Sequence, residues 1–124
     1  MNDDSLLHRQ VHPSWVQGDR VTSQTFKPTP KDKQKLSMYN GEMIEAPAAW
    51  EHFTSEGHDS AGVLSVTHGE CCGHALKVDV DGTPFPEHVS VDFEGFSGNQ
   101  TEKVAKKLRT QALARGWSFR APPA

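Results

Sequence analysis

Short runs in which apolar and polar residues alternate constrain the fold of this chain more than any other feature. In residues 76–82 and 88–93 valine alternates with acidic or polar side chains, and residues 61–67 form the most apolar run. Alternation with a period of two gives a strand one core face and one wet face, as in antiparallel sheets. The expected strands are residues 6–11, 18–26, 36–39, 61–67, 76–82 and 88–93.

A first helix is predicted between the strand candidates, over about ten residues of the segment 46–57. Pro47 suits the first helical position, and Gly57 can end the helix. Trp50 and Phe53 are three residues apart and share one face of it.

A second, longer helix is predicted near the C-terminus. Asn99 and Glu102 have the spacing of a capping box, and Gly116 is placed to end the helix. Its core-facing stripe spans an arc of about 100°. The residues of that stripe are Val104, Ala105, Leu108 and Ala112.

The element order indicates the fold class and the domain organisation. Strands come first, one helix is inserted among them and the longer helix follows, which is typical of an α+β domain. We expect a mostly antiparallel sheet of about five or six short strands and two helices. The 124 residues suffice for a single domain over 1–124. Residues 1–5 and 121–124 are expected to be flexible.

Residues 66–74 (VTHGECCGH) hold both cysteines and two histidines. Zinc prefers four tetrahedral Cys or His ligands, normally from separate parts of a fold. One reading is therefore a zinc site, and another is a thiol nucleophile activated by a histidine. A structural turn with cysteine as a small apolar residue is the interpretation that we favour. The zinc reading would use His68, Cys71, Cys72 and His74, or else Cys71 or Cys72 with His68 and with His52, His58 or His88 from elsewhere.

Carboxylates gather on the polar face predicted for the hairpin 76–93. Asp79, Asp81 and Asp92 alternate with valines, and His88 shares their side of the sheet. Such oxygen ligands could hold a magnesium or manganese ion. We favour a solvated acidic surface that faces a partner.

Charge is distributed unevenly along the chain, although the net charge is only −3. Residues 40–98 contain one lysine and eleven acidic residues, whereas residues 99–124 contain six basic residues and one acidic residue. The basic segment either neutralises the acidic body or attracts a charged partner. Its candidate partner-binding residues are Lys103, Lys106, Lys107 and Arg109. They could also contact nucleic acid, but the pI near 6.1 argues against a dedicated binder.

The composition also limits the cellular setting. No run approaches the roughly 20 apolar residues of a membrane span, and the acidic first residues do not form a secretory signal. Two adjacent cysteines cannot build a useful disulfide framework, so we expect a cytoplasmic protein. Together with AWEHF and FPEHVSVDF, the run LSMYNGE resembles small uncharacterised bacterial proteins without a known activity.

These patterns favour a non-catalytic protein-binding or accessory module, such as a regulator, immunity protein or antitoxin. It would use the acidic sheet face and the basic helix, without a cofactor, and its oligomeric state is left open. A small metal- or thiol-dependent enzyme and a weak nucleic-acid binder are the alternatives. If His8, Arg9, His12, Tyr39 or the cysteines converge on one pocket, an enzyme gains over a binding module.

Overall fold

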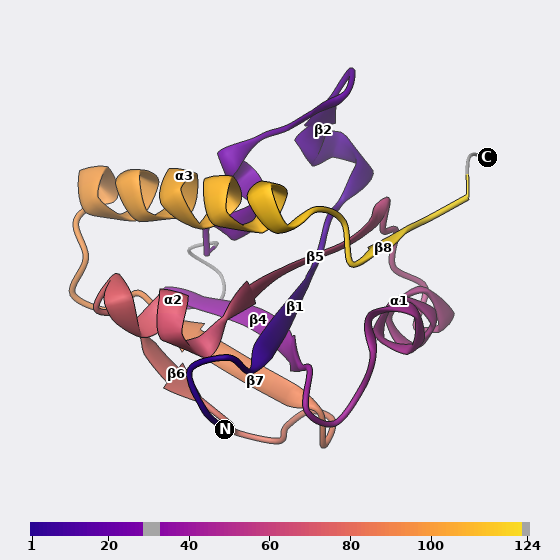
Figure 1. Cartoon of the computed structure of the whole chain (residues 1–124), viewed down its shortest axis with the longest axis horizontal. Helices are drawn as coiled ribbons and strands as arrows, with labels where there is room; N and C mark the ends of the chain where they lie inside the picture. Colours follow the sequence, from indigo (N-terminus) through magenta and orange to yellow (C-terminus); the bar gives the residue numbers. More distant parts are fainter. Residues whose placement is uncertain (29–32, 123–124) are drawn as a thin grey trace.

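The structure, a computed structural model that describes residues 1–28 and 33–122, is built on one six-stranded sheet (Figure 1). Every pairing within this sheet is antiparallel, and the longest helix is C-terminal, so the predicted α+β class is confirmed. In order across the sheet, the strands are β6 (Lys77–Asp79), β7 (His88–Asp92), β4 (Lys35–Asn40), β1 (Leu6–Gln10), β5 (Gly62–Thr67) and β8 (Phe119–Arg120).

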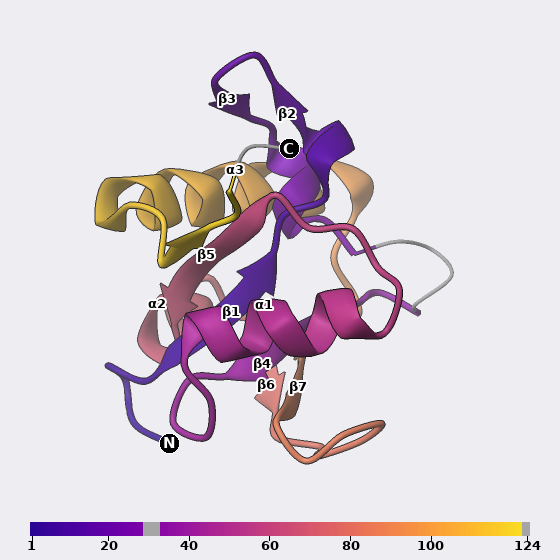
Figure 2. The same cartoon turned by 90° about the vertical axis from the view of Figure 1, so that its right-hand side faces the viewer.

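Helices pack on both faces of this sheet. The helices are α1 (Ala46–Ser55), α2 (His68–Gly73) and α3 (Gly98–Arg115), and the shorter elements are the 3-10 turns η1 (Pro13–Trp15) and η2 (Ser23–Phe26) and the hairpin of β2 (Val16–Gln17) with β3 (Arg20–Val21). α1 lies on one face, over β1, β5 and β8, whereas α2 and α3 pack on the opposite face (Figure 2). Both predicted helices are present, and α2 is an additional one.

The main hydrophobic core lies between the sheet and α3. Leu7 of β1 and Leu64 of β5 point into it, and both are 0% exposed. Ala105 and Leu108 of α3 meet them from the other side, which confirms the predicted apolar stripe of this helix. Gly116 follows the helix with a φ of 91°, a conformation that favours glycine, and so acts as its C-cap as predicted.

The predicted start of α3 is wrong by two residues. Ser97 is the N-cap, and its Oγ accepts a hydrogen bond from the backbone N–H of Gln100 at 3.1 Å. The Gln100 side chain returns the bond to the Ser97 backbone N–H at 2.8 Å. Asn99 is therefore already helical, and Glu102 instead accepts a hydrogen bond from Ser23 Oγ at 2.9 Å.

α1 has its predicted length of ten residues and covers half of the second face of the sheet. The Gln10 side chain of β1 donates to the Ala49 carbonyl of α1 at 3.1 Å. The Trp50 ring packs against Phe119 of β8, with 5.2 Å between the ring centroids. The other half of this face is formed by β4, β7 and β6, and α1 reaches it at Tyr39 of β4, whose hydroxyl lies 2.8 Å from His52.

Two predicted elements differ from the structure. Residues 18–26, expected as one strand, form β3 and then η2, which buries Thr25 and Phe26 against the core side of the sheet. Residues 66–74, expected as a turn, contain α2, because Thr67 and Glu70 form a capping box. A side-chain cap at Thr67, directly before the first helical residue, thus favours the helix over the turn.

The hairpin of β6 and β7 has the predicted antiparallel pairing, but β6 is shorter than expected. Val78 packs against the core, whereas Val80 lies beyond the strand and is 52% exposed. The alternation expected for residues 76–82, with one core face and one wet face, therefore ends before Val80.

Both ends of the chain make backbone contacts. The Asp3 and Ser5 carbonyls accept hydrogen bonds from Gly69 and His68, and the Ala121 N–H donates to the Ala61 carbonyl. Residues 123–124 of the predicted flexible end lie outside the described residues, and the flexibility of both ends stays a prediction.

Candidate functional site

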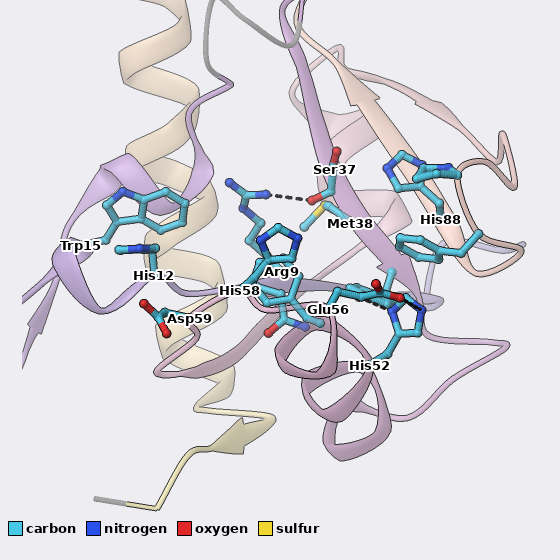
Figure 3. A pocket seen from close by; sticks show the side chains of 15 residues that line it. Arg9, His12, Trp15, Ser37, Met38, His52, Glu56, His58, Asp59 and His88 are labelled. Carbon is cyan, nitrogen blue, oxygen red and sulfur yellow. Dashed lines mark hydrogen bonds and ion pairs between the residues drawn. The ribbon is translucent and has the colours of Figure 1, made fainter. Parts of the chain in front are cut away.

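A cavity of about 500 Å³ lies on the second sheet face, between the C-terminal end of α1 and the half formed by β4 and β7 (Figure 3). Its walls come from η1, β1, β4, the C-terminal half of α1 with the loop that follows, the 82–87 loop and β7. The lining residues are Arg9, Gln10, His12, Trp15, Ser37, Met38, Tyr39, His52, Phe53, Glu56, His58, Asp59, Pro84, Phe85 and His88. Four of the seven histidines of the chain are among them.

The cavity opens where β1 and β4 separate. Their pairing consists of Leu7 with Asn40 and His8 with Tyr39, and no further pair continues toward Ser37. The Arg9 guanidinium fills this position, and its Nη1 donates to the Ser37 carbonyl at 2.9 Å. A side chain therefore satisfies a strand carbonyl where the ladder ends, which leaves room beside the sheet.

An aromatic and imidazole cluster forms one end of the cavity. The Phe85 ring stacks on Tyr39 with 4.8 Å between centroids and lies 4.7 Å from the His52 ring. The Tyr39 hydroxyl is 2.8 Å from His52 Nδ1. Burial, together with the nearby Glu87 and Glu56 carboxylates, raises the pKa of Tyr39 to about 12. The hydroxyl therefore stays protonated at neutral pH and shares a hydrogen bond with His52 Nδ1.

The other end is formed by η1. Trp15 stacks with the Arg9 guanidinium at 5.2 Å, and its ring lies 5.7 Å from that of His12. The backbone N–H of Ser14 donates to His12 Nδ1 at 3.1 Å, so in the neutral ring the proton is on Nε2. His12 thus lines the cavity with a fixed ring orientation.

His88 lies beside the Phe85 ring and is held from behind by a carboxylate. Its Nδ1 is 2.7 Å from Asp81 Oδ1, and Ser90 Oγ donates to Asp81 Oδ2 at 2.7 Å. Burial raises the pKa of Asp81, but the hydrogen bonds from His88 and Ser90 outweigh it and hold the pKa below its usual range. Asp81 is therefore ionised at neutral pH.

Comparison with known proteins gives no family for this arrangement. The chain matches no protein-family model, no curated protein and no solved structure. The resemblance to small bacterial proteins therefore stays a prediction, and the site has to be argued from its own geometry.

The predicted zinc ligands do not converge. Cys71 is 0% exposed in the core, whereas Cys72 on the same short helix is exposed. Burial, the neighbouring Cys72 and Glu70 raise the pKa of Cys71 to about 12, so its thiol is protonated at neutral pH. His68 lies 3.7 Å from Cys72 Sγ, while His74 bonds to Gln111. Over residues 1–28 and 33–122, no group of three or more His, Cys, Asp or Glu side chains could hold a metal ion.

The predicted hairpin carboxylates are engaged in different ways. Asp81 binds His88 and Ser90, as described above. Asp92 lies between Lys35 of β4 and Lys77 of β6 in the strand register, so its charge has basic cross-strand neighbours. Asp79 is exposed beside them. The hairpin is thus less acidic in space than along the sequence.

The predicted basic surface of α3 is present as exposed side chains. Lys103, Lys106 and Lys107 are exposed, and Arg109 is half-buried. Lys106 approaches Glu102 at 3.9 Å, one helical turn away. Over the described residues, no helix is long and apolar enough to cross a membrane.

The sequence pointed to part of this cavity and missed part of it. Arg9, His12 and Tyr39 line it, as the pocket hypothesis required for an enzyme. His8 does not, because it lies under α1, where its Nδ1 meets Ser65 Oγ and its Nε2 meets the Ile44 carbonyl. The contributions of Phe53, Glu56 and Phe85 went unpredicted. The high number of histidines in a short chain was the available signal for such a site.

Proposed function

We propose that the cavity binds a planar aromatic small molecule. The observation that carries this proposal is a hollow of about 500 Å³ walled by aromatic and imidazole rings. Ligand pockets of proteins have volumes of roughly 300–1,000 Å³ and combine apolar walls with a few polar groups. The main hydrophobic core lies on the opposite face of the sheet, so these rings form a second cluster outside it. An accessible apolar cluster of this kind often marks a binding site.

The charged groups of the cavity walls favour an aromatic ligand with little net charge. Arg9 contributes a positive charge, but Thr25 and Ser37 carbonyls accept its hydrogen bonds and Trp15 covers it. Glu56 and Asp59 contribute negative charges at the same cavity. A ring ligand can stack on Phe85 and Trp15, because aromatic pairs prefer offset or edge-to-face contacts.

Titration with simple aromatic probes tests the proposal. Phenol and indole are added to the isotope-labelled protein, and backbone amide NMR shifts are followed. Saturable shifts are expected for the cavity residues and not for α3. Ser37→Phe places a ring in the cavity without removing a side-chain contact and is expected to abolish the shifts.

Two phenylalanines give a matched pair of variants. Phe85 and Phe96 are both half-buried and each contacts a neighbouring ring, but only Phe85 lines the cavity. Phe85→Ala is expected to weaken probe binding by roughly two- to tenfold, since an aromatic pair contributes about 0.5–1.5 kcal/mol. Phe96→Ala is expected to leave it unchanged. Equal effects of both variants, or shifts spread over the whole chain, would contradict the proposal.

A second proposed function is docking of a partner on α3, either a protein or, as an alternative, nucleic acid. It is supported by the exposed Lys103, Lys106 and Lys107, and by a depression that Lys106 and Lys107 share with His74. Duplex DNA and an acidic polypeptide are the probes, in gel-shift experiments across salt concentrations. Phosphate contacts make binding salt-sensitive, so a Lys103→Glu, Lys107→Glu variant should lose it. No binding of either probe at low salt would remove this function.

We also propose a reducing, cytoplasmic setting, in a bacterium as the sequence resemblance implies. Cys72 is an exposed free thiol and Cys71 a buried one. An exposed unpaired thiol suits compartments that keep thiols reduced.

A further inference from the structure

The hydrogen bonds around His88 fix which of its ring nitrogens carries a proton. Asp81 is ionised, and an ionised carboxylate accepts hydrogen bonds but cannot donate them. The 2.7 Å contact between Asp81 Oδ1 and His88 Nδ1 therefore places a proton on Nδ1. In the neutral ring, Nε2 then carries a lone pair and is a hydrogen-bond acceptor.

Nothing in the described part of the chain occupies this acceptor. His88 lines the cavity, its side chain is 9% exposed, and its one hydrogen-bonded ring nitrogen is Nδ1. Nε2 is not among the fully buried polar atoms that lack a partner, so it keeps some solvent exposure. A ligand is therefore the natural donor to Nε2.

The ring of His88 is also held against rotation. Phe85 packs on it edge to face, with 5.3 Å between centroids and planes at 84°. Ser90 Oγ binds the other oxygen of the Asp81 carboxylate at 2.7 Å, so the carboxylate is fixed in turn. A carboxylate that orients a histidine and stabilises its charged form is the arrangement by which proteins make the far nitrogen a base.

The other histidines of the cavity have different partners. His52 Nδ1 lies 2.8 Å from the Tyr39 hydroxyl, and its Nε2 lies 3.9 Å from a Glu56 oxygen. In neutral His12 the proton is on Nε2, because Nδ1 accepts the Ser14 backbone N–H. The fourth histidine of the cavity, His58, stacks on Phe53. His88 is the histidine of this group whose Nδ1 is paired with a carboxylate.

On the basis of the proposed function, we propose that His88 is a general base that deprotonates a bound aromatic N–H or O–H acid. The ligand's O–H or N–H bond breaks, the proton forms a new bond with His88 Nε2, and its electron pair stays on the ligand. Asp81 is the positioning residue, because its carboxylate stabilises the imidazolium that results. The ligand class narrows accordingly to phenols and heteroaromatic N–H acids.

Two coloured probes test this base with the intact protein. Para-nitrophenol changes its absorption when it ionises, whereas para-nitroanisole has the same ring system without the acidic proton. With the wild-type protein, bound para-nitrophenol is expected to be ionised at a pH where the free probe is largely protonated. Para-nitroanisole is expected to bind without any such change.

Variants separate the base from the cavity. His88→Gln retains a donor for Asp81 but has no basic nitrogen, so both probes should bind and the phenol should stay protonated. Asp81→Asn should lower the ratio of bound phenolate to phenol by roughly tenfold, the effect of losing one adjacent charge. Asp79→Asn removes the same charge from an exposed position of the same hairpin and should change nothing.

The outcomes distinguish the two proposals. If para-nitrophenol binds without ionising, or ionises equally in His88→Gln, the base is refuted and the cavity stands. If neither probe binds, the proposed function itself fails. Nitrogen-15 NMR of the histidine rings needs no variant, and a proton on Nε2 of neutral His88 would refute the base directly.

Discussion

Glu70 is expected to anchor α2 by two separable interactions. Its Oε1 accepts a hydrogen bond from the Thr67 backbone N–H at 2.8 Å, which completes the capping box. Its carboxylate also meets the Arg115 guanidinium of α3 at 3.2 Å. The Glu70 and Arg115 side chains are 20% and 32% exposed, so the ion pair is partly screened by water.

Two substitutions at Glu70 divide these contributions. Glu70→Ala removes the cap, worth about 1 kcal/mol, and the ion pair, worth about 0.2–1 kcal/mol, so we expect a loss of about 1–2 kcal/mol. Glu70→Gln keeps an oxygen for the Thr67 N–H and removes the charge, so we expect a loss of about 0.5 kcal/mol. Glu51→Gln, at an exposed position of α1, is the matched control and should be neutral.

The Glu70→Gln effect is expected to depend on pH. Burial raises the pKa of Glu70, but the contacts with Arg115 and Thr67 outweigh it and hold the folded-state pKa below its usual range. The charge therefore contributes stability above the unfolded-state pKa of about 4.3, and this contribution is lost as the pH falls through the folded-state pKa. The wild-type and Glu70→Gln proteins should converge in acid.

Urea unfolding followed by circular dichroism, at neutral and acidic pH, measures these differences. The reasoning would be refuted if Glu70→Gln were as destabilising as Glu70→Ala. A difference between wild type and Glu70→Gln that did not shrink in acid would refute it as well, because the charge would then contribute nothing.

Two further predictions concern the core and the thiols. Leu64→Ala should destabilise the fold by about 2–5 kcal/mol, because Leu64 is 0% exposed, whereas Leu113→Ala at a 40% exposed position should cost under about 0.5 kcal/mol. Urea unfolding measures both losses, and equal losses would contradict the described core. A thiol reagent should label Cys72 in the folded protein and Cys71 only after denaturation, because burial raises the Cys71 pKa to about 12. Mass spectrometry counts the labels, and rapid labelling of both cysteines would show that α2 does not hold Cys71 in the core.

The sequence predicted those parts of the fold that depend on local periodicity. The stripe of Ala105, Leu108 and Ala112 repeats at helical spacing, and it is buried as expected. Val89 and Val91 alternate with polar residues in β7, and both are 0% exposed. Period and turn signals are properties of neighbouring residues, so they can be read without knowing the rest of the chain.

Some local elements could not be predicted, because their outcome depends on competing contacts. Thr25 and Phe26 have the composition of a strand, yet η2 buries them against the core. The segment with Cys71 and Cys72 looked like a turn, yet the Thr67 and Glu70 cap makes it helical and sends the two thiols to opposite environments.

The sequence by itself determined that this chain forms an α+β domain, because alternation and helical spacing are written into adjacent residues. Only the tertiary structure decided where its histidines meet. His12, His52 and His88 are far apart in the sequence, and they share a cavity because the β1–β4 pairing ends early and Phe85 of the 82–87 loop stacks on Tyr39. The proton positions on those rings follow from partners such as Asp81, whose contact with His88 exists only in the folded chain.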